Sequence, residues 1–277
     1  RERIPRFSWY RAAAARHMNR TALKSGANSL TSHAHRWVLL RATGILSSRV
    51  TTWSTAGDKP LHRLMFYIPT TVEYTLTGYV GERRPFEDRY LGLYADADLA
   101  GDRPSYKSTM GNFAVLQGPN TDFAFAARSK SIGGVCSSTP EARLAATNAI
   151  IKGFGMPTVD LLAQMRGEDC TDGAIRINNI KETKYTWNNQ VGTQAVLYED
   201  NTAAIQIIGT GKNPTMKHLQ RHQGINIRLL QDLFHPRDRE TFEPLESAFA
   251  IEYTESLKQR ADAITKAFRD CLLYTSP

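Results

Sequence analysis

The order of the apolar segments is the feature that most constrains this chain, because the hydrophobic period alternates between strand and helix after residue 90. Leu91, Leu93 and Ala95 share one face of a predicted strand, and Asp96 faces the other way. Two more strands are predicted in NFAVLQGP and DFAFAARSK, and the Gly-Pro-Asn between them favours a hairpin. Strands are also predicted in AVLYED and FAIEYTE. We therefore expect an α/β plan in which an antiparallel hairpin joins parallel strands.

Helices are predicted between and after these strands. Ser-Ser-Thr-Pro at 137–140 has the order of a helix start, so a helix is expected to about residue 152. Further helices are predicted at 158–165, in NTAAIQII, from about 216 to 234, and at 260–268. Before the first strand, a helix is expected to begin with Asp58 as N-cap and Pro60 in the first turn, and to end at Pro69.

The positive charge of the chain is concentrated in its first quarter. The formal net charge is +8, yet residues 1–69 hold 12 Lys or Arg and 2 Asp or Glu, whereas the remaining 208 residues hold 23 and 25. This pattern fits a basic arm that meets nucleic acid, and it fits equally well a solvated leader. The sequence has no apolar run long enough for a membrane span, and no secretory signal is predicted. Three widely separated cysteines predict an intracellular, reducing setting.

These patterns suggest a division of the chain into four parts. Residues 1–50 are expected to form a basic, weakly ordered leader, with one short helix over 11–20. Residues 51–87 are expected to contain a helix and a linker rich in Gly, Arg and Pro. The α/β domain is expected at 88–268, with an inserted polar loop at 167–192. Residues 269–277 form a tail whose origin, native or appended, stays open.

The candidates for chemistry are carboxylates at strand ends and helix starts, because the sequence contains no Gly-rich phosphate loop, nucleophile elbow or thiol site. Asp96 lies on the polar face of its strand. Asp200 follows the strand AVLYE directly, and Asp262 opens the last predicted helix. Each of them also has a simpler explanation without a catalytic role. Asp200 and Asp262 could stabilise helix N-termini, and Asp96 could lie on a solvated strand face.

Five motifs in one order give these carboxylates a context. They are YADADLAGDRPSYKSTMG, SSTPEARLAA, LYEDNTAAI, MKHL and QRADAITKAF. In this order they resemble the ribonuclease H domain of copia-type retrotransposon polyproteins, over roughly residues 90–268. WSTAGDKPLHRLMFYI also resembles the segment that joins the reverse transcriptase to that domain, so residues 51–87 would be a remnant of this connection.

The resemblance implies a fold, an activity and a set of site residues. The fold would be a ribonuclease H-like mixed five-stranded sheet flanked by helices. The activity would be hydrolysis of the RNA strand of RNA–DNA hybrids, with two Mg²⁺ ions held by carboxylates. Asp96, Asp200 and Asp262 match three of the four metal-binding positions. The partners would be the hybrid and the reverse transcriptase portion of the same polyprotein, in a cytoplasmic particle or the nucleus.

A basic helix face is the candidate for substrate contacts. Lys217 and Arg221 are four residues apart on the predicted helix, so both could meet phosphates. A solvated helix face explains the same spacing. His218 matches the Lys-His pair of the family, and a histidine that is bonded locally explains it at least as well.

The remaining metal-binding position, the second in chain order, departs from the family pattern. Where the family has Glu-Ala-Glu, this chain has Glu141-Ala142-Arg143. Arginine stays protonated, so Arg143 is expected to pair with Asp96 and Asp200 and to oppose Mg²⁺. Glu141 cannot replace the missing carboxylate, because two residues along a helix turn it by about 200°. The sequence thus predicts an impaired nuclease. The alternatives are an inactive module that binds nucleic acid or another part of the polyprotein, and a decayed retrotransposon copy.

Overall fold

The computed structural model describes residues 36–71, 73, 76–81, 89–102, 106–165, 194–216, 218–219, 224–238, 240–244 and 247–266. The chain divides into two compact units, whose described residues lie in 36–76 and in 77–266. Several predicted features lie outside the described residues. They are the helix over 11–20, most of the linker before residue 88, the loop at 167–192, the tail at 269–277, and the side chains of Lys217 and Arg221.

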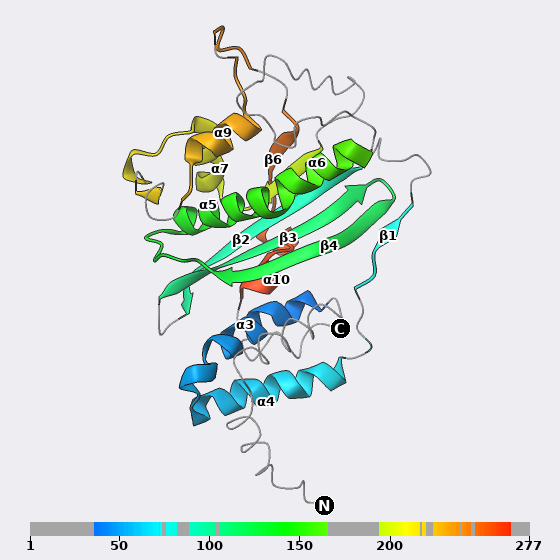
Figure 1. The fold of residues 1–277 in the computed structure, drawn as a ribbon, viewed down its shortest axis with the longest axis vertical. Coiled ribbons are helices and arrows are strands. Elements are labelled where there is room, and N and C mark those ends of the chain that lie inside the picture. The colour runs from blue at the N-terminus through cyan, green and yellow to red at the C-terminus, as the bar shows by residue number, and fades with distance from the viewer. Residues whose placement is uncertain are drawn as a thin grey trace, which may run out of the picture. The chain divides into compact units, whose positions relative to one another are not determined.

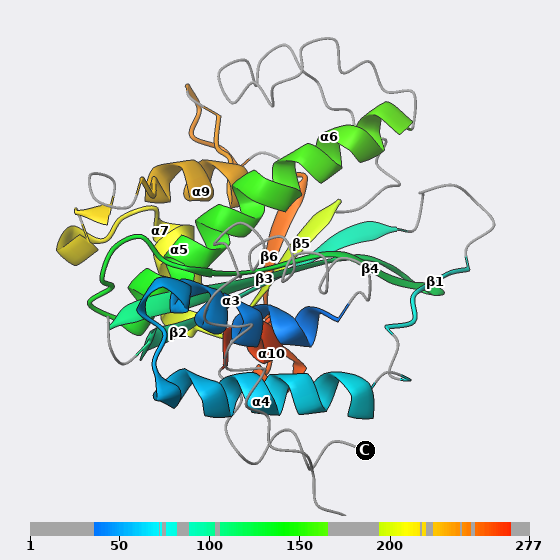
Figure 2. The ribbon, with the colours of Figure 1, turned by 60° about the horizontal axis from the view of Figure 1, so that its bottom comes forward.

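The first unit is a pair of helices that lie side by side (Figure 2). Helix α3, Leu40–Ser48, follows a 3₁₀ turn at Trp37–Leu39, and α4 spans Thr55–Thr70. They bury Leu39, Leu46 and Leu64 together. No helix was predicted over 40–48, because its apolar residues are interrupted by Arg, Thr and Gly.

The predicted boundaries of α4 were wrong. The helix begins at Thr55, runs through Pro60, and includes Pro69 before it ends at Thr70. Asp58 does not cap it, because its Oδ1 atom accepts a hydrogen bond of 3.0 Å from Nε1 of Trp53. Burial of Leu64 against α3 stabilises a helix in which both prolines lack an amide hydrogen.

The second unit is built on a mixed sheet (Figure 1). Its strands are β1 (Tyr79–Val80), β2 (Tyr90–Asp102), β3 (Lys107–Gly118), β4 (Thr121–Ser131), β5 (Ala195–Glu199) and β6 (Phe249–Tyr253). The order is β1-β4-β3-β2-β5-β6. The pairs β1–β4, β4–β3 and β3–β2 are antiparallel, whereas the pairs β2–β5 and β5–β6 are parallel. The predicted mixed α/β sheet is confirmed at all five predicted strands, and β1 adds a short edge strand.

One face of the sheet is covered by a long helical segment (Figures 1 and 2). Helix α5, Thr139–Ile150, begins as predicted, because the Ser138 side chain accepts a hydrogen bond from the amide of Glu141. A π-helical turn at Ile151–Gly155 joins it directly to α6, Met156–Met165. The two predicted helices are therefore one interrupted helix.

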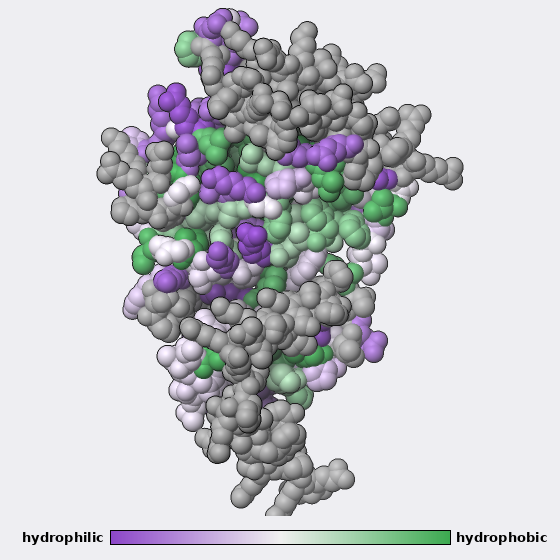
Figure 3. All heavy atoms as spheres, in the orientation of Figure 1, coloured by the Kyte–Doolittle hydropathy of each residue, from purple (hydrophilic) through white to green (hydrophobic). Residues whose placement is uncertain are grey.

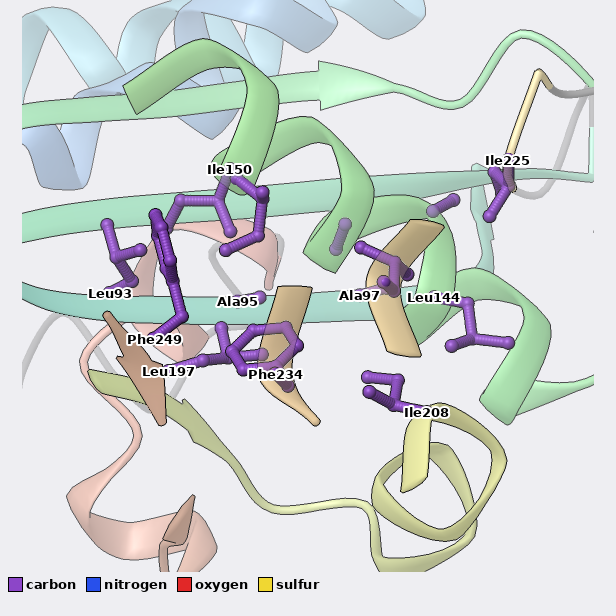
Figure 4. Packing of buried hydrophobic residues seen from close by; sticks show 14 of the residues in the cluster. Leu93, Ala95, Ala97, Leu144, Ile150, Leu197, Ile208, Ile225, Phe234 and Phe249 are labelled. Carbon is purple, nitrogen blue, oxygen red and sulfur yellow. The ribbon is translucent and has the colours of Figure 1, made fainter. Parts of the chain in front are cut away.

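The main core lies between this helical segment and the sheet (Figure 4). Leu93, Ala95 and Ala97 of β2 share one buried cluster with Leu144 and Ile150 of α5. The same cluster also takes in Leu197, Ile208, Ile225, Phe234 and Phe249. The polar helix α5 lies here because its small residues let it approach the sheet closely, with Ala142 and Ala146 fully buried.

The remaining helices are α7 (Thr202–Thr210), α9 (Ile227–Phe234) and α10 (Asp262–Thr265), with 3₁₀ turns at Pro214–Met216 and Ser256–Lys258. The single helix predicted over 216–234 was wrong. Residues 224–226 are not helical, Gly224 has a φ of +65°, and Asn226 caps α9 through the amide of Leu229. Helix α10 is shorter than predicted, since it begins two residues later. In the described part of the chain, none of the helices has the length and apolar character to span a bilayer.

We predict that Leu144→Ala lowers the free energy of unfolding by about 2–5 kcal/mol, because the fully buried side chain leaves a cavity between α5 and the sheet. The matched control is Leu161→Ala on α6, where the side chain is 54% exposed and the change should stay within about 0.5 kcal/mol. Urea unfolding of both variants measures the difference. Equal losses would contradict this assignment of the core.

Candidate functional site

Arg143 of α5 lies between two of the predicted carboxylates. Its Nη2 atom is 2.6 Å from Oδ1 of Asp96, and its Nη1 atom is 2.6 Å from Oδ1 of Asp200. Asp96 lies on β2 and Asp200 directly follows β5. These strands are parallel neighbours, in register from Leu91 with Ala195, so their carboxyl ends meet at one place. The ion pairs that the sequence predicted for Arg143 are therefore present.

A buried glutamate, which sequence reasoning missed, completes this centre. Glu199 is fully buried, and its Oε1 atom lies 3.5 Å from Nη1 of Arg143 and accepts a hydrogen bond of 3.1 Å from the amide of Asn201. Its Oε2 atom accepts from the hydroxyl of Thr147 at 3.4 Å. A signal was available, because Glu199 is two residues after the apolar Leu197 and therefore shares its inward face of β5.

Burial governs the electrostatics of these carboxyls. Burial raises the pKa of Glu199 to about 8, against the opposing effects of the Arg143 guanidinium and the Asn201 amide. Burial also raises the pKa of Asp96, while Arg143 and the Thr265 hydroxyl oppose the shift. The centre therefore concentrates three acidic side chains around one permanent cation.

The segment before and within α10 approaches the centre from the other side. The Thr265 hydroxyl donates a hydrogen bond to Oδ2 of Asp96, and the Ser256 hydroxyl donates one of 2.9 Å to Oδ2 of Asp200. Asp262, the third predicted carboxylate, pairs with Lys266 at 2.6 Å. Burial, Arg143 and Thr265 have the three largest effects on the pKa of Asp96. The next largest comes from the negative charge of Asp262, which raises that pKa. The structure therefore brings Asp262 near the centre but pairs it with a different cation.

Two side chains hold this segment against the sheet. Nε2 of the buried Gln259 donates hydrogen bonds of 3.1 Å to the carbonyl oxygens of Ala95 and Tyr198, so one amide ties together β2 and β5. Arg260 donates from two nitrogens to the two oxygens of Asp122, at 2.8 and 2.5 Å. These contacts fix the position of α10 and hence of Thr265 and Asp262.

His218 and Glu141 form a separate cluster at the start of α5. Nε2 of His218 lies 3.2 Å from Oε1 of Glu141, whose Oε2 atom accepts hydrogen bonds from the amide and hydroxyl of Ser137. Burial acts to raise the pKa of Glu141, but the hydrogen bonds from Ser137 and His218 together hold that pKa below its usual range. Glu141 thus contacts a different set of groups from Arg143. His218 therefore contacts a side chain 77 residues away in the sequence and not a local group, and a role of His218 in substrate binding stays a prediction.

The residues present do not fit the Mg²⁺ ions that the resemblance implies. Mg²⁺ requires oxygen ligands at about 2.0–2.1 Å in octahedral geometry. Here the Oδ1 atoms of Asp96 and Asp200 both face the guanidinium of Arg143 at ion-pair distance. Within the described ranges, no group of three or more His, Cys, Asp or Glu side chains could hold a metal ion. The cation in this centre is therefore a side chain of the protein.

Comparison with known proteins gives no family assignment. No family model matches the sequence, and no curated protein matches it. Among solved structures, the chain is similar to the N-terminal ribonuclease H domain of a Mycobacterium tuberculosis protein, solved as a fusion with maltose-binding protein. That match has 13% identity and a TM-score of 0.32, and it covers 63% of this chain and 93% of that one.

A second similar structure is the protease–reverse transcriptase of prototype foamy virus, with 10% identity and a TM-score of 0.29. It covers 65% of this chain, which spans 19% of the viral chain. Both TM-scores lie below 0.5, so the fold class given above rests on the strand order and strand directions of this chain.

We predict that the free energy of unfolding falls as the pH rises from about 5 to 8. The folded state binds the Glu199 proton more tightly than the unfolded state, because its pKa is about 8 rather than 4.5, so a rising pH removes that stabilisation. Glu199 alone can contribute at most about 1.4 kcal/mol per pH unit. Glu199→Gln, which resembles the protonated acid, should flatten this slope in urea unfolding measured across the range.

The control for this measurement is Glu255→Gln, because the Glu255 side chain is 64% exposed and should leave the slope unchanged. A slope that is the same in the Glu199→Gln variant and in the unmodified chain would show that Glu199 is not protonated in the folded state.

Proposed function

We propose that this chain is the ribonuclease H module of a copia-type retrotransposon polyprotein, and that Arg143 impairs its nuclease centre. The ancestral reaction is hydrolysis of the RNA strand of an RNA–DNA hybrid. The observation that carries the proposal is the pair of 2.6 Å contacts from Arg143 to Asp96 and Asp200. The five ordered sequence motifs support the family. In that family's pattern, Asp96 and Asp200 match metal-binding residues, and a glutamate stands at the position of Arg143.

The inferred loss of activity follows from charge. In a ribonuclease H centre, Mg²⁺ would activate the attacking water and stabilise the leaving oxygen. A guanidinium cannot ligate a metal, and it cannot be deprotonated in a protein. To admit Mg²⁺, Arg143 would have to leave Asp96, Asp200 and Glu199, and its side chain is 11% exposed. The cost of separating a buried cation from its carboxylates opposes that exchange.

The proposed partners are an RNA–DNA hybrid and the reverse transcriptase portion of the same polyprotein, in an intracellular setting. The basic excess of residues 1–69 supports contact with a polyanion. The α3–α4 pair includes the segment that resembles the connection to the reverse transcriptase. Lys217 and Arg221 remain proposed phosphate contacts.

A second candidate is a catalytically silent module that binds nucleic acid or another part of the polyprotein. The closed Arg143 centre favours it as much as it favours an impaired nuclease, because the ion pairs of Arg143 oppose metal binding in both cases. A decayed copy without a selected role is the third reading. These three candidate functions differ in whether replacement of Arg143 restores metal binding and cleavage.

We predict that Arg143→Glu in the full chain gains Mg²⁺-dependent cleavage of a labelled RNA–DNA hybrid, by about 100-fold or more over the unmodified chain. The substitution removes the guanidinium and supplies the fourth carboxylate from the same position of α5. Since four neighbouring carboxylates repel one another, Mg²⁺ should also raise the melting temperature of this variant and leave that of the unmodified chain unchanged.

Two controls accompany the assay. Arg143→Gln removes the positive charge without supplying a carboxylate and should stay silent, and Asp96→Asn in the Arg143→Glu background should abolish the gain. Equal Mg²⁺-dependent cleavage by the unmodified chain would refute the role given to Arg143. A folded Arg143→Glu variant that Mg²⁺ stabilises but that cleaves nothing would favour the silent module or the decayed copy.

A further inference from the structure

Three exposed basic side chains gather where β4 meets the π-helical turn after α5. Arg128 and Lys130 are two residues apart on β4, so they share one face of the strand, and Lys152 lies in the turn itself. A Cβ atom added at Gly153, the neighbour of Lys152, would lie 3.4 Å from Nη1 of Arg128. We call Arg128, Lys130 and Lys152 the β4 basic patch.

The patch lies on the α5 side of the sheet. Arg128 pairs in register with Asn112, whose side-chain amide donates to the carbonyl oxygen of Ala146 in α5. In Figure 1, β4 runs in front of β3, and Figure 3 shows hydrophobic and hydrophilic surface side by side on this face of the molecule. In the described chain β4 pairs with β1 only at Thr121 and Asp122, so the stretch with Arg128 and Lys130 lies on an edge.

The guanidinium of Arg128 is held in place by a ring instead of a carboxylate. It lies over Phe154 of the π-helical turn, 5.2 Å from the ring centroid. Among the described residues, Arg128, Lys130 and Lys152 have no ion-pair partner. Two other basic side chains close to the sheet do have one, since Arg143 pairs with Asp96 and Arg260 pairs with Asp122.

We propose that the β4 basic patch binds the phosphate backbone of the RNA–DNA hybrid, an inference that rests on the proposed function. Residues 70–277 are nearly neutral as a whole, so three unpaired cations at one edge are a local excess. A guanidinium that is already oriented on a ring loses little entropy when it binds a phosphate through two N–H groups.

The patch lies on the side of the sheet from which Arg143 reaches the centre. Arg128 lies in the row of Ala95 and Asn112, whose side chains face α5, and Arg143 of α5 extends from the same side to Asp96 and Asp200. Two strand spacings, about 10 Å, separate β2 from β4. A nucleic-acid backbone that approaches the centre from the α5 side would therefore have phosphates within reach of the patch.

The test is hybrid binding by the full chain, measured by fluorescence anisotropy in EDTA so that no cleavage is needed. Arg128→Gln/Lys130→Gln/Lys152→Gln should weaken binding at every salt concentration. It should also reduce the slope of log affinity against log salt by about two to three, one for each lost phosphate contact. Lys212→Gln/Arg237→Gln/Lys258→Gln removes the same charge from exposed positions elsewhere and should leave the slope unchanged.

An equal slope for the patch variant and the unmodified chain, with both folded by circular dichroism, would overturn the proposal. A competition experiment gives a second test. If polyglutamate displaces the labelled hybrid as well as unlabelled hybrid of equal charge does, the proposal is also overturned, because the patch would then be a site for acidic protein segments. A failure of the proposed function would appear in a different measurement. If Arg143→Glu gains no cleavage but the patch variant still loses salt dependence, the patch stands and the nuclease assignment falls.

Discussion

The polar centre of the second unit is organised around the guanidinium of Arg143. It ties α5 to the carboxyl ends of β2 and β5 through Asp96 and Asp200, and it also faces Glu199. A buried cation of this kind contributes little net stability if it is compared with a well-packed apolar residue. Removal of one partner is costly, since it leaves an uncompensated charge inside the protein. The acidic residues and Arg143 therefore require one another.

The surrounding residues can be understood as support for that arrangement. Thr265 and Ser256 donate to the second oxygens of Asp96 and Asp200, while Thr147 and the Asn201 amide donate to Glu199. Gln259 joins the two parallel strands through their carbonyl oxygens. Arg143 thus lies in an ordered centre, in which the acidic side chains gather around a guanidinium of the protein.

The sequence predicted much of the fold, because its signals there are local and repeated. The alternation around Leu93, the Gly-Pro-Asn turn and the Ser-Ser-Thr-Pro helix start each depend on a few neighbouring residues, and the structure agrees with them. The missed features depend on tertiary contacts. Helix α3 is stabilised by burial against α4, and the prolines of α4 lie inside a helix that packing extends.

The centre was predictable only in part, for a similar reason. The pairing of Arg143 with Asp96 and Asp200 follows from charge once the strand order is known. Glu199 was missed although its alternation with Leu197 indicated an inward position, and the size of its raised pKa depends on the tertiary packing that buries it. The partner of Asp262 is Lys266, one helical turn away on a short helix. That local pair was visible in the spacing, but it competes with the role that the resemblance gives to Asp262.

The central proposal is that the guanidinium of Arg143 takes the place that a metal ion would have between Asp96 and Asp200. The most direct measurement is anomalous X-ray diffraction from crystals of the full chain grown with Mn²⁺, a scatterer that takes the same oxygen ligands as Mg²⁺. The account predicts no anomalous peak between Asp96 and Asp200, with density for Arg143 bridging them. A Mn²⁺ peak on these two carboxylates, with Arg143 turned away, would contradict it.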